Sequence, residues 1–134
     1  ANKMQGMASI YLSFILENKP ILVKGSRERF RDFVYIDDVV DAWLSALDMP
    51  AAFGKTYNLG TGRQTTVSDL LQTMTACAGN PDYPIEFSGN TPGDQFGMYA
   101  DIGRLRADLG WEPRWSLEQG LASMLDSYKS GERT

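Results

Sequence analysis

The stretch RERFRDFVYIDDVVDAW, residues 27–43, joins a run of charges to an apolar segment and then to a second charged pair. The apolar run at residues 33–36 is rich in β-branched and aromatic side chains, which predicts a strand. Asp37 and Asp38 follow it, and the apolar residues after them recur at helical spacing. Arg31 therefore stands at the start of an expected strand that leads directly into a helix. A fixed cation at this place suits a phosphate site, and it also suits an exposed turn.

Five segments repeat apolar residues every three to four positions, which predicts five helices. Two of them begin with a capping box, in which a hydroxyl residue and an acid or amide three positions later bond each other's backbone N–H groups. These pairs are Thr66 with Asp69 and Ser116 with Gln119. The expected helices run near residues 7–15, 40–47, 67–78, 102–109 and 117–128.

Short β-rich segments lie between the expected helices and are bounded by glycine, proline, asparagine or aspartate. Because strands that alternate with helices are typical of α/β proteins, we expect a small mixed α/β domain with about five helices and short strands. A chain of this length buries about two thirds of the surface that its unfolded form exposes, so we expect residues 1–134 to form a single domain. The expected strands are residues 21–24, 33–36, 56–59 and 85–87.

The composition excludes several classes of function. The net charge is −4 and no run of lysine or arginine occurs, which argues against nucleic-acid binding. No apolar stretch approaches the roughly 20 residues that cross a bilayer, so we expect no membrane partner. Histidine is absent, which removes Ser-His-Asp catalysis and histidine-containing zinc motifs, and we predict no metal site. Cys77 is the only cysteine, so no intrachain disulfide forms and a reduced, cytoplasmic setting is expected.

The run NLGTGRQTT, residues 58–66, places a Gly-Thr-Gly turn at residues 60–62 between an expected strand and an expected helix. Free N–H groups in such a turn can bind a phosphate. The dinucleotide fingerprint, however, needs a third glycine where Thr65 stands, and an acid about 20 residues later, where the nearest acids are Asp82 and Glu86. A tight strand-to-helix turn is therefore the favoured interpretation.

The charges of the opening stretch also have a structural interpretation. A surface Arg31 that pairs with Asp32 or Glu28 is what these residues alone favour. Arg27 and Arg29 are then solvated neighbours. A guanidinium at this place remains a phosphate candidate, because it binds phosphate with two parallel hydrogen bonds and stays charged at any useful pH.

Three further features have a structural and a functional interpretation. Asp37 and Asp38 suit acid–base catalysis or helix capping, and capping explains them more simply. Asp94, in the turn of TPGDQFGMYAD, accepts a hydrogen bond from a sugar hydroxyl or caps its own turn. Trp111 and Trp115 flank the tripeptide EPR, and a packed corner between the last two helices is favoured over a stacking platform.

Taken in order, the motifs resemble the carboxyl-terminal part of the NAD-dependent epimerase/dehydratase family, the extended short-chain dehydrogenase/reductases typified by UDP-galactose 4-epimerase. The RDFxYxDD element and the GD…AD…LGWxP element are both fairly specific. The match covers residues 2 to about 128 and begins with QGMASIYLSFILENKP. It is carried by PILVKGSRERFRDFVYIDDVVDAW, KTYNLGTGRQTTVSDLL and TPGDQFGMYADIGRLRADLGWEPRWSLEQGL. The resemblance implies the C-terminal portion of such an enzyme, without most of the Rossmann half.

The resemblance implies a binding site for a nucleotide sugar, with UDP or dTDP as the nucleotide. In the family, the arginine of the RDF element contacts the substrate diphosphate, and the residue two positions later lines the pocket. The preceding strand offers backbone groups to the nucleobase, and the aspartate of the Pro-Gly-Asp turn contacts the nucleotide. The substrate-binding residues implied here are Arg31, Asp94, Phe33, Val23, Lys24, Leu22 and, more weakly, Met7.

One family position differs in this chain. The family often carries a second phosphate-binding arginine just before the Pro-Gly-Asp turn, and here that position is Thr91. The loss of one charge-assisted contact weakens diphosphate binding by about 1.5–3 kcal/mol. Lys24 and Arg63 are the cations that we consider as substitutes.

The family's NAD fingerprint and catalytic Tyr-x-x-x-Lys pair are not in this sequence, since they belong to the amino-terminal half. We therefore predict no catalytic and no cofactor-binding residue here, with NAD bound by a full-length parent and not by this chain alone. The implied function is the substrate-binding portion of an enzyme like UDP-glucose 4-epimerase, or of a related dehydratase or decarboxylase, inactive alone. The alternative is a stand-alone, non-catalytic module that binds nucleotide sugars or assembles into a homo-oligomer.

Overall fold

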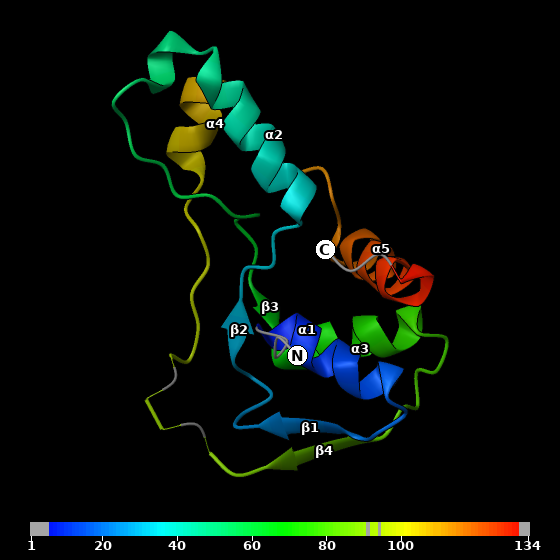
Figure 1. Ribbon diagram of the computed structural model, residues 1–134. Coiled ribbons are helices and arrows are strands. Elements are labelled where there is room, and N and C mark those ends of the chain that lie inside the picture. The colour runs from blue at the N-terminus through cyan, green and yellow to red at the C-terminus, as the bar shows by residue number, and fades with distance from the viewer. Residues whose placement is uncertain (1–5, 91, 94, 132–134) are drawn as a thin grey trace.

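The computed structural model describes residues 6–90, 92–93 and 95–131 (Figure 1). Within these residues the chain forms the five expected α-helices, which confirms the predicted mixed α/β class. The helices are α1 (Met7–Leu16), α2 (Ile36–Leu47), the 3-10 helix η1 (Pro50–Ala52), α3 (Val67–Cys77), α4 (Gly103–Leu109) and α5 (Leu117–Ser130). The strands are β1 (Ile21–Lys24), β2 (Phe30–Arg31), β3 (Thr65–Thr66) and β4 (Ile85–Ser88).

The larger core lies between the β1–β4 pair and the helices α1, α3 and α5 (Figure 1). β1 and β4 run parallel, with Ile21 opposite Ile85. Side chains alternate along a strand, so Ile21 and Val23 are buried while Leu22 and Lys24 are exposed. The helices contribute the remaining buried side chains of this core, which are Tyr11, Leu12, Val67, Leu70, Leu71, Met74, Leu121 and Leu125.

A second, smaller core lies where α4 runs beside α2, apart from the layer of α1, α3 and α5 (Figure 1). It consists of Ala42 from α2, Leu105 from α4, and Ile102 and Trp111, which flank α4. The loop residues Tyr57 and Leu59 pack against it from the connection that follows η1. This small core positions residues 57–59, which matter for the site described below.

The ends of the helices follow the sequence signals. In α3, the Thr66 hydroxyl accepts from the backbone N–H of Asp69, and the Asp69 carboxylate accepts from that of Thr66. Ser116 and Gln119 form the same reciprocal pair at the start of α5. Gly110 ends α4 with a φ of 64°, in the left-handed region that favours glycine.

None of these helices is a candidate for spanning a bilayer. The longest, α5, has 14 residues. Among the residues that the structure describes, no helix combines enough length with enough apolar character to cross a membrane.

Two of the four strand predictions are wrong. Residues 33–36 form no strand, because the backbone pairs earlier, with Phe30 opposite Thr66 and Arg31 opposite Thr65 in an antiparallel bridge. Residues 56–59 form no strand either, and no backbone–backbone hydrogen bond joins them to any other described residue. Both segments have β propensity, but a strand also needs a partner, which local sequence does not supply.

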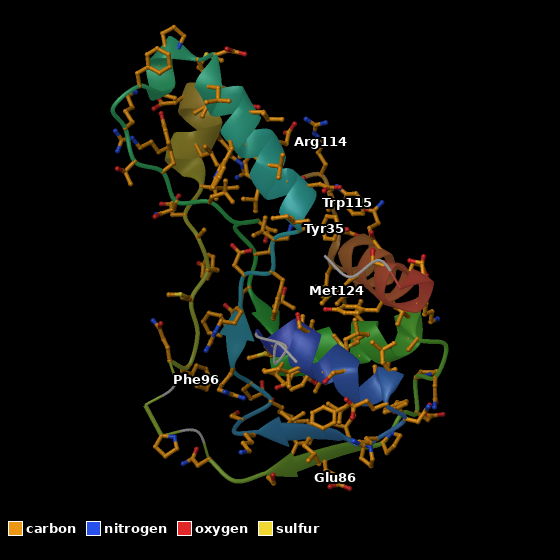
Figure 2. The ribbon with its side chains drawn as sticks, viewed as in Figure 1. Tyr35, Glu86, Phe96, Arg114, Trp115 and Met124 are labelled. Carbon is orange, nitrogen blue, oxygen red and sulfur yellow. The ribbon has the colours of Figure 1, made fainter. Side chains whose placement is uncertain are left out.

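Helix capping by Asp37 or Asp38 is also not observed. The N-cap of α2 is Tyr35, and no side chain caps this end. Asp38 is 2% exposed, and its carboxylate accepts from the backbone N–H groups of Arg114 (3.0 Å) and Trp115 (3.1 Å). The Trp115 ring lies 4.2 Å from the Tyr35 ring, centroid to centroid, beside the start of α2 (Figure 2). The predicted packed corner before α5 is therefore confirmed, and Asp38 is one of the groups that hold it.

Candidate substrate-binding site

A cavity of about 490 Å³ opens beside Arg31. Two separate stretches of chain, residues 57–59 and 98–100, form its walls together with Arg31 and Asp32. Its volume lies within the roughly 300–1,000 Å³ that is usual for small-molecule sites. The cavity therefore has the size and the cation that a diphosphate ligand requires.

Asp32 fixes the walls of this cavity. Its carboxylate accepts from the backbone N–H groups of Thr61 (2.8 Å), Gly62 (2.9 Å) and Ala100 (3.1 Å), and from the Thr61 hydroxyl. Gly60 allows this approach, since a Cβ there would lie 2.5 Å from an Asp32 oxygen. One carboxylate thus ties the turn after residues 57–59 to the end of residues 98–100.

The same contacts decide how the Gly-Thr-Gly turn at residues 60–62 is used. Its N–H groups point at an anion, as a phosphate cradle requires, but the anion is the chain's own Asp32 carboxylate. The residues here do not fit a dinucleotide phosphate at this turn. The tight-turn interpretation is the one that the structure supports.

Arg31 ends β2 and lines the cavity. Its Nη1 donates to the carbonyl oxygen of Phe30 (2.7 Å) and, more weakly, to that of Phe96 (3.4 Å). Phe96 lies on the segment that passes β2 (Figure 2), and the Phe30 N–H donates to its carbonyl at 3.1 Å. These bonds hold the guanidinium beside the cavity.

Arg29 is not the solvated neighbour that the sequence predicts. It is 6% exposed, and its guanidinium donates to the carbonyl oxygens of Ser26 (3.1 Å) and Lys24. Arg27 remains on the surface, and its guanidinium carbon Cζ lies 4.5 Å from the centre of the Phe87 ring. Arg29 is thus a structural residue that fixes the chain between β1 and β2.

The predicted β1 residues lie on opposite faces of the strand. Val23 is fully buried in the larger core, and neither its side chain nor its backbone reaches the surface. Leu22 and Lys24 point to the exposed face. Met7 begins α1 and packs against the core. The predicted site residue Asp94 lies outside the described residues, as does Thr91.

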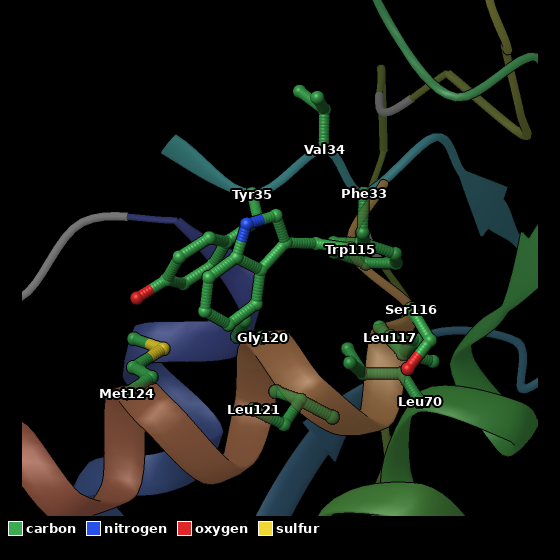
Figure 3. Close-up of a pocket in the computed structure, with 11 residues that line it drawn as sticks. Phe33, Val34, Tyr35, Leu70, Trp115, Ser116, Leu117, Gly120, Leu121 and Met124 are labelled. Atoms are coloured by element: carbon green, nitrogen blue, oxygen red, sulfur yellow. The ribbon is translucent and has the colours of Figure 1, made fainter. Parts of the chain in front are cut away.

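Phe33 lines a different and smaller pocket from the one beside Arg31. This pocket has a volume of about 100 Å³ and lies between the segment after β2 and helix α5. Figure 3 shows Phe33 and Tyr35 above Leu121 and Met124 of α5. The Tyr35 hydroxyl also shares a hydrogen bond of 2.7 Å with Ser123. The structure therefore does not bring Phe33 and Arg31 to one cavity.

Sequence reasoning missed several residues that line the Arg31 cavity, among them Tyr57, Met98 and Tyr99.

Tyr57 donates from its hydroxyl to Asp108 (2.8 Å), which also accepts from Lys55 (2.8 Å). Burial and the bond to Asp108 raise the pKa of Tyr57. The hydrogen bonds from Lys55 and Tyr57 lower the pKa of Asp108. The Tyr-Asn-Leu-Gly run carried a signal for a strand but none for a cavity wall.

The family model for GDP-mannose 4,6 dehydratase matches residues 6–124 of this chain. Among curated proteins, a UDP-glucose 4-epimerase of Mycolicibacterium smegmatis is 33% identical over 125 residues, which is 93% of this chain and 39% of the relative. The chain spans about two fifths of the length of this relative and of two further curated relatives that it matches.

Solved structures of similar enzymes also match nearly all of this chain but only part of their own length. UDP-glucose 4-epimerase of Thermotoga maritima, solved with UDP-glucose, is 30% identical with a TM-score of 0.87, over 98% of this chain and 42% of that one. UDP-glucuronic acid 4-epimerase of Bacillus cereus, solved with UDP-glucuronic acid and NAD, is 27% identical with a TM-score of 0.85. This match covers 94% of the present chain and 40% of the Bacillus cereus enzyme. The present fold is thus a portion of these larger folds.

Proposed function

We propose that this chain, which belongs to the GDP-mannose 4,6-dehydratase family, binds a nucleotide sugar. The chain corresponds to the C-terminal part of the epimerase-like members of this family. The relatives named above include enzymes that were solved with UDP-sugars. The observation that carries the proposal is the position of Arg31, a tethered cation at the edge of a cavity of about 490 Å³.

Arg31 is proposed to bind the diphosphate. A guanidinium donates two parallel hydrogen bonds to phosphate oxygens and stays charged at neutral pH. Asp32 supports this role indirectly, since it fixes Thr61 and Ala100 around the cavity. The proposed ligand is a UDP- or dTDP-sugar, and the proposed parent reaction is epimerisation or dehydration of the sugar.

NAD belongs to the proposed parent reaction, where it takes up and returns a hydride. The residues described here do not fit that cofactor at the Gly-Thr-Gly turn of residues 60–62, where Asp32 accepts from the N–H groups. We therefore assign to this chain the binding of the substrate and no step of the hydride transfer.

Isothermal titration calorimetry with UDP tests this proposal. We expect Arg31→Ala to weaken UDP binding by roughly 10- to 150-fold, the equivalent of about 1.5–3 kcal/mol for one charge-assisted contact. Arg31→Lys is expected to recover part of the loss, because it keeps the charge but not the planar fork.

The matched control is Arg106→Ala, which removes an exposed arginine that pairs with Glu112 near the end of α4. This variant should bind UDP as the original chain does. Equal affinities for Arg31→Ala and Arg106→Ala would remove Arg31 from the site.

A further inference from the structure

The charges in the wall of the Arg31 cavity limit the kind of sugar that it can hold. Among the described residues that line the cavity, Arg31 is the one cation and Asp32 is the one anion. The other described residues of the wall are uncharged, and they are Tyr57, Asn58, Leu59, Met98, Tyr99 and Ala100. The wall therefore holds one positive and one negative charge before a ligand binds.

The proposed ligand already uses the positive charge of this wall. A diphosphate carries more negative charge than one guanidinium offsets, and Arg31 is the group proposed to bind it. A guanidinium that donates two parallel hydrogen bonds to phosphate oxygens is engaged on the face that a second anion needs. Because the described wall offers no other cation, a further negative charge on the ligand stays uncompensated there.

The negative charge of the wall is spread over several hydrogen bonds but is not cancelled. The Asp32 carboxylate accepts from the backbone N–H groups of Thr61, Gly62 and Ala100, and from the Thr61 hydroxyl. All of these donors are neutral groups. A second carboxylate in the cavity is repelled by Asp32, and the repulsion is stronger than in bulk water because protein atoms replace part of the solvent.

The two solved relatives named above were solved with sugars that differ in charge. The Thermotoga maritima enzyme was solved with UDP-glucose, and the Bacillus cereus enzyme with UDP-glucuronic acid. Glucose has a neutral hydroxymethyl group where glucuronic acid has a carboxylate, and the two ligands are otherwise alike. The charge of the cavity wall is therefore a feature that can separate them.

We propose that the Arg31 cavity holds the sugar of the nucleotide sugar and takes a neutral hexose in preference to a uronic acid. The carboxylate of a uronic acid enters this cavity without a cation, beside the diphosphate and Asp32, and an unpaired charge excludes a competing ligand. A hydroxymethyl group meets no such penalty, since the Asn58 amide offers it a neutral donor and acceptor. The inference rests on the proposed function, because it needs the diphosphate at Arg31.

Calorimetric titration of the chain with UDP, UDP-glucose and UDP-glucuronic acid tests the proposal. At low salt we expect UDP-glucose to bind about 10-fold or more tightly than UDP-glucuronic acid, because only the second ligand brings an uncompensated charge. The ratio of the two affinities should narrow when the ionic strength rises from about 0.01 M to about 1 M, since the Debye length falls from roughly 30 Å to 3 Å. A preference that comes from shape alone does not respond to salt.

The variant Met98→Lys supplies the cation that the described wall lacks. Met98 lines the cavity and is 54% exposed, so a lysine fits there without a loss of core packing. We expect this variant to bind UDP-glucuronic acid at least as tightly as UDP-glucose. Met98→Gln, which has a similar length and no charge, should keep the original preference. Met49→Lys should also keep it, because it adds the same charge at a 36% exposed residue outside the cavity wall.

Three results would overturn the proposal. The first is equal or tighter binding of UDP-glucuronic acid by the original chain at low salt. The second is a preference for UDP-glucose that salt does not change. The third is an equal effect of Met98→Lys and Met49→Lys, which would place the sugar outside the cavity. Titration with UDP separates these results from a failure of the proposed function. If UDP binds through Arg31 while the two sugars bind alike, only this inference fails, whereas a chain that does not bind UDP contradicts both.

Discussion

Arg31 and Asp32 are neighbours in sequence but have different tasks. Arg31 supplies a charge to a cavity, while Asp32 bonds to residues 29 to 68 positions away and holds the cavity walls together. The sequence alone favoured a surface ion pair between Arg31 and a nearby acid, because Asp32 and Glu28 are the acids closest to Arg31 along the chain. Asp32 lacked any signal for its role, since its partners come together only in the folded chain.

The Asp108 carboxylate should make stability depend on acid pH. Lys55 and Tyr57 donate to it and hold the pKa of Asp108 below its ordinary value of about 3.9. A lowered pKa in the folded chain gives stability that is present above the unfolded value and is lost as pH falls through the folded one. We expect Asp108→Asn to lower the melting temperature between pH 5 and 8, and the difference to shrink below about pH 4.

Thermal unfolding of both proteins across this range, followed by circular dichroism, provides the check. Asp126→Asn on the exposed side of α5 is the matched control and should unfold like the original chain at every pH. A difference between Asp108→Asn and the original chain that stays constant down to pH 3 would contradict the account.

At the scale of elements, the helices were predictable and half of the strands were not. Helical spacing and capping boxes are local signals, and the boxes at Thr66 and Ser116 form as predicted. Strands depend on partners far along the chain. β1 pairs with β4 although 60 residues separate the two strands in sequence. Residues 56–59, in contrast, have no strand partner among the described residues.

Asp38 links two elements, and its removal should weaken that link. The buried carboxylate accepts from the backbone of Arg114 and Trp115 and so ties α2 to the corner before α5. Asp38→Ala leaves two amide groups without their acceptor, which we expect to cost about 1.5–3 kcal/mol of the free energy of unfolding. Urea denaturation at neutral pH measures this cost.

Asp37→Ala is the control for this measurement. Asp37 stands in the same first turn of α2 but is exposed, so its removal should cost at most a few tenths of a kcal/mol. Equal losses for the two variants would show that the helix end, and not the corner, is what Asp38 stabilises.

At the scale of the whole molecule, the family resemblance led to Arg31, but no sequence pattern indicated its cavity. The cavity arises because residues 57–59 and 98–100 face each other across Asp32, and these stretches are about 40 residues apart in sequence. The resemblance also grouped Phe33 with Arg31, whereas the structure places Phe33 in the smaller pocket beside α5. The sizes and walls of the two pockets depend on tertiary packing, which spacing along one chain does not encode.

The chain alone should bind substrate without converting it. We expect no sugar epimer, detected by chromatography of the nucleotide sugars, when the chain is mixed with NAD and UDP-glucose or UDP-glucuronic acid, because epimerisation returns the hydride and its product is the only lasting sign of turnover. The physical reason is that the glycine-rich turn at residues 60–62 bonds Asp32 and does not offer its N–H groups to a cofactor phosphate. The intact Thermotoga relative serves as the positive control for the assay. Turnover by this chain would contradict the assignment of a binding role alone.

The most direct test of the central claim is to map UDP on this chain by nuclear magnetic resonance. We predict that titration with UDP shifts the Arg31 Nε–H signal and the backbone amides of residues 57–59 and 98–100, which surround the cavity. Amides around the smaller pocket, such as those of Leu121 and Met124, should move little. Shifts that gather at the smaller pocket, or their absence at saturating UDP, would contradict the account.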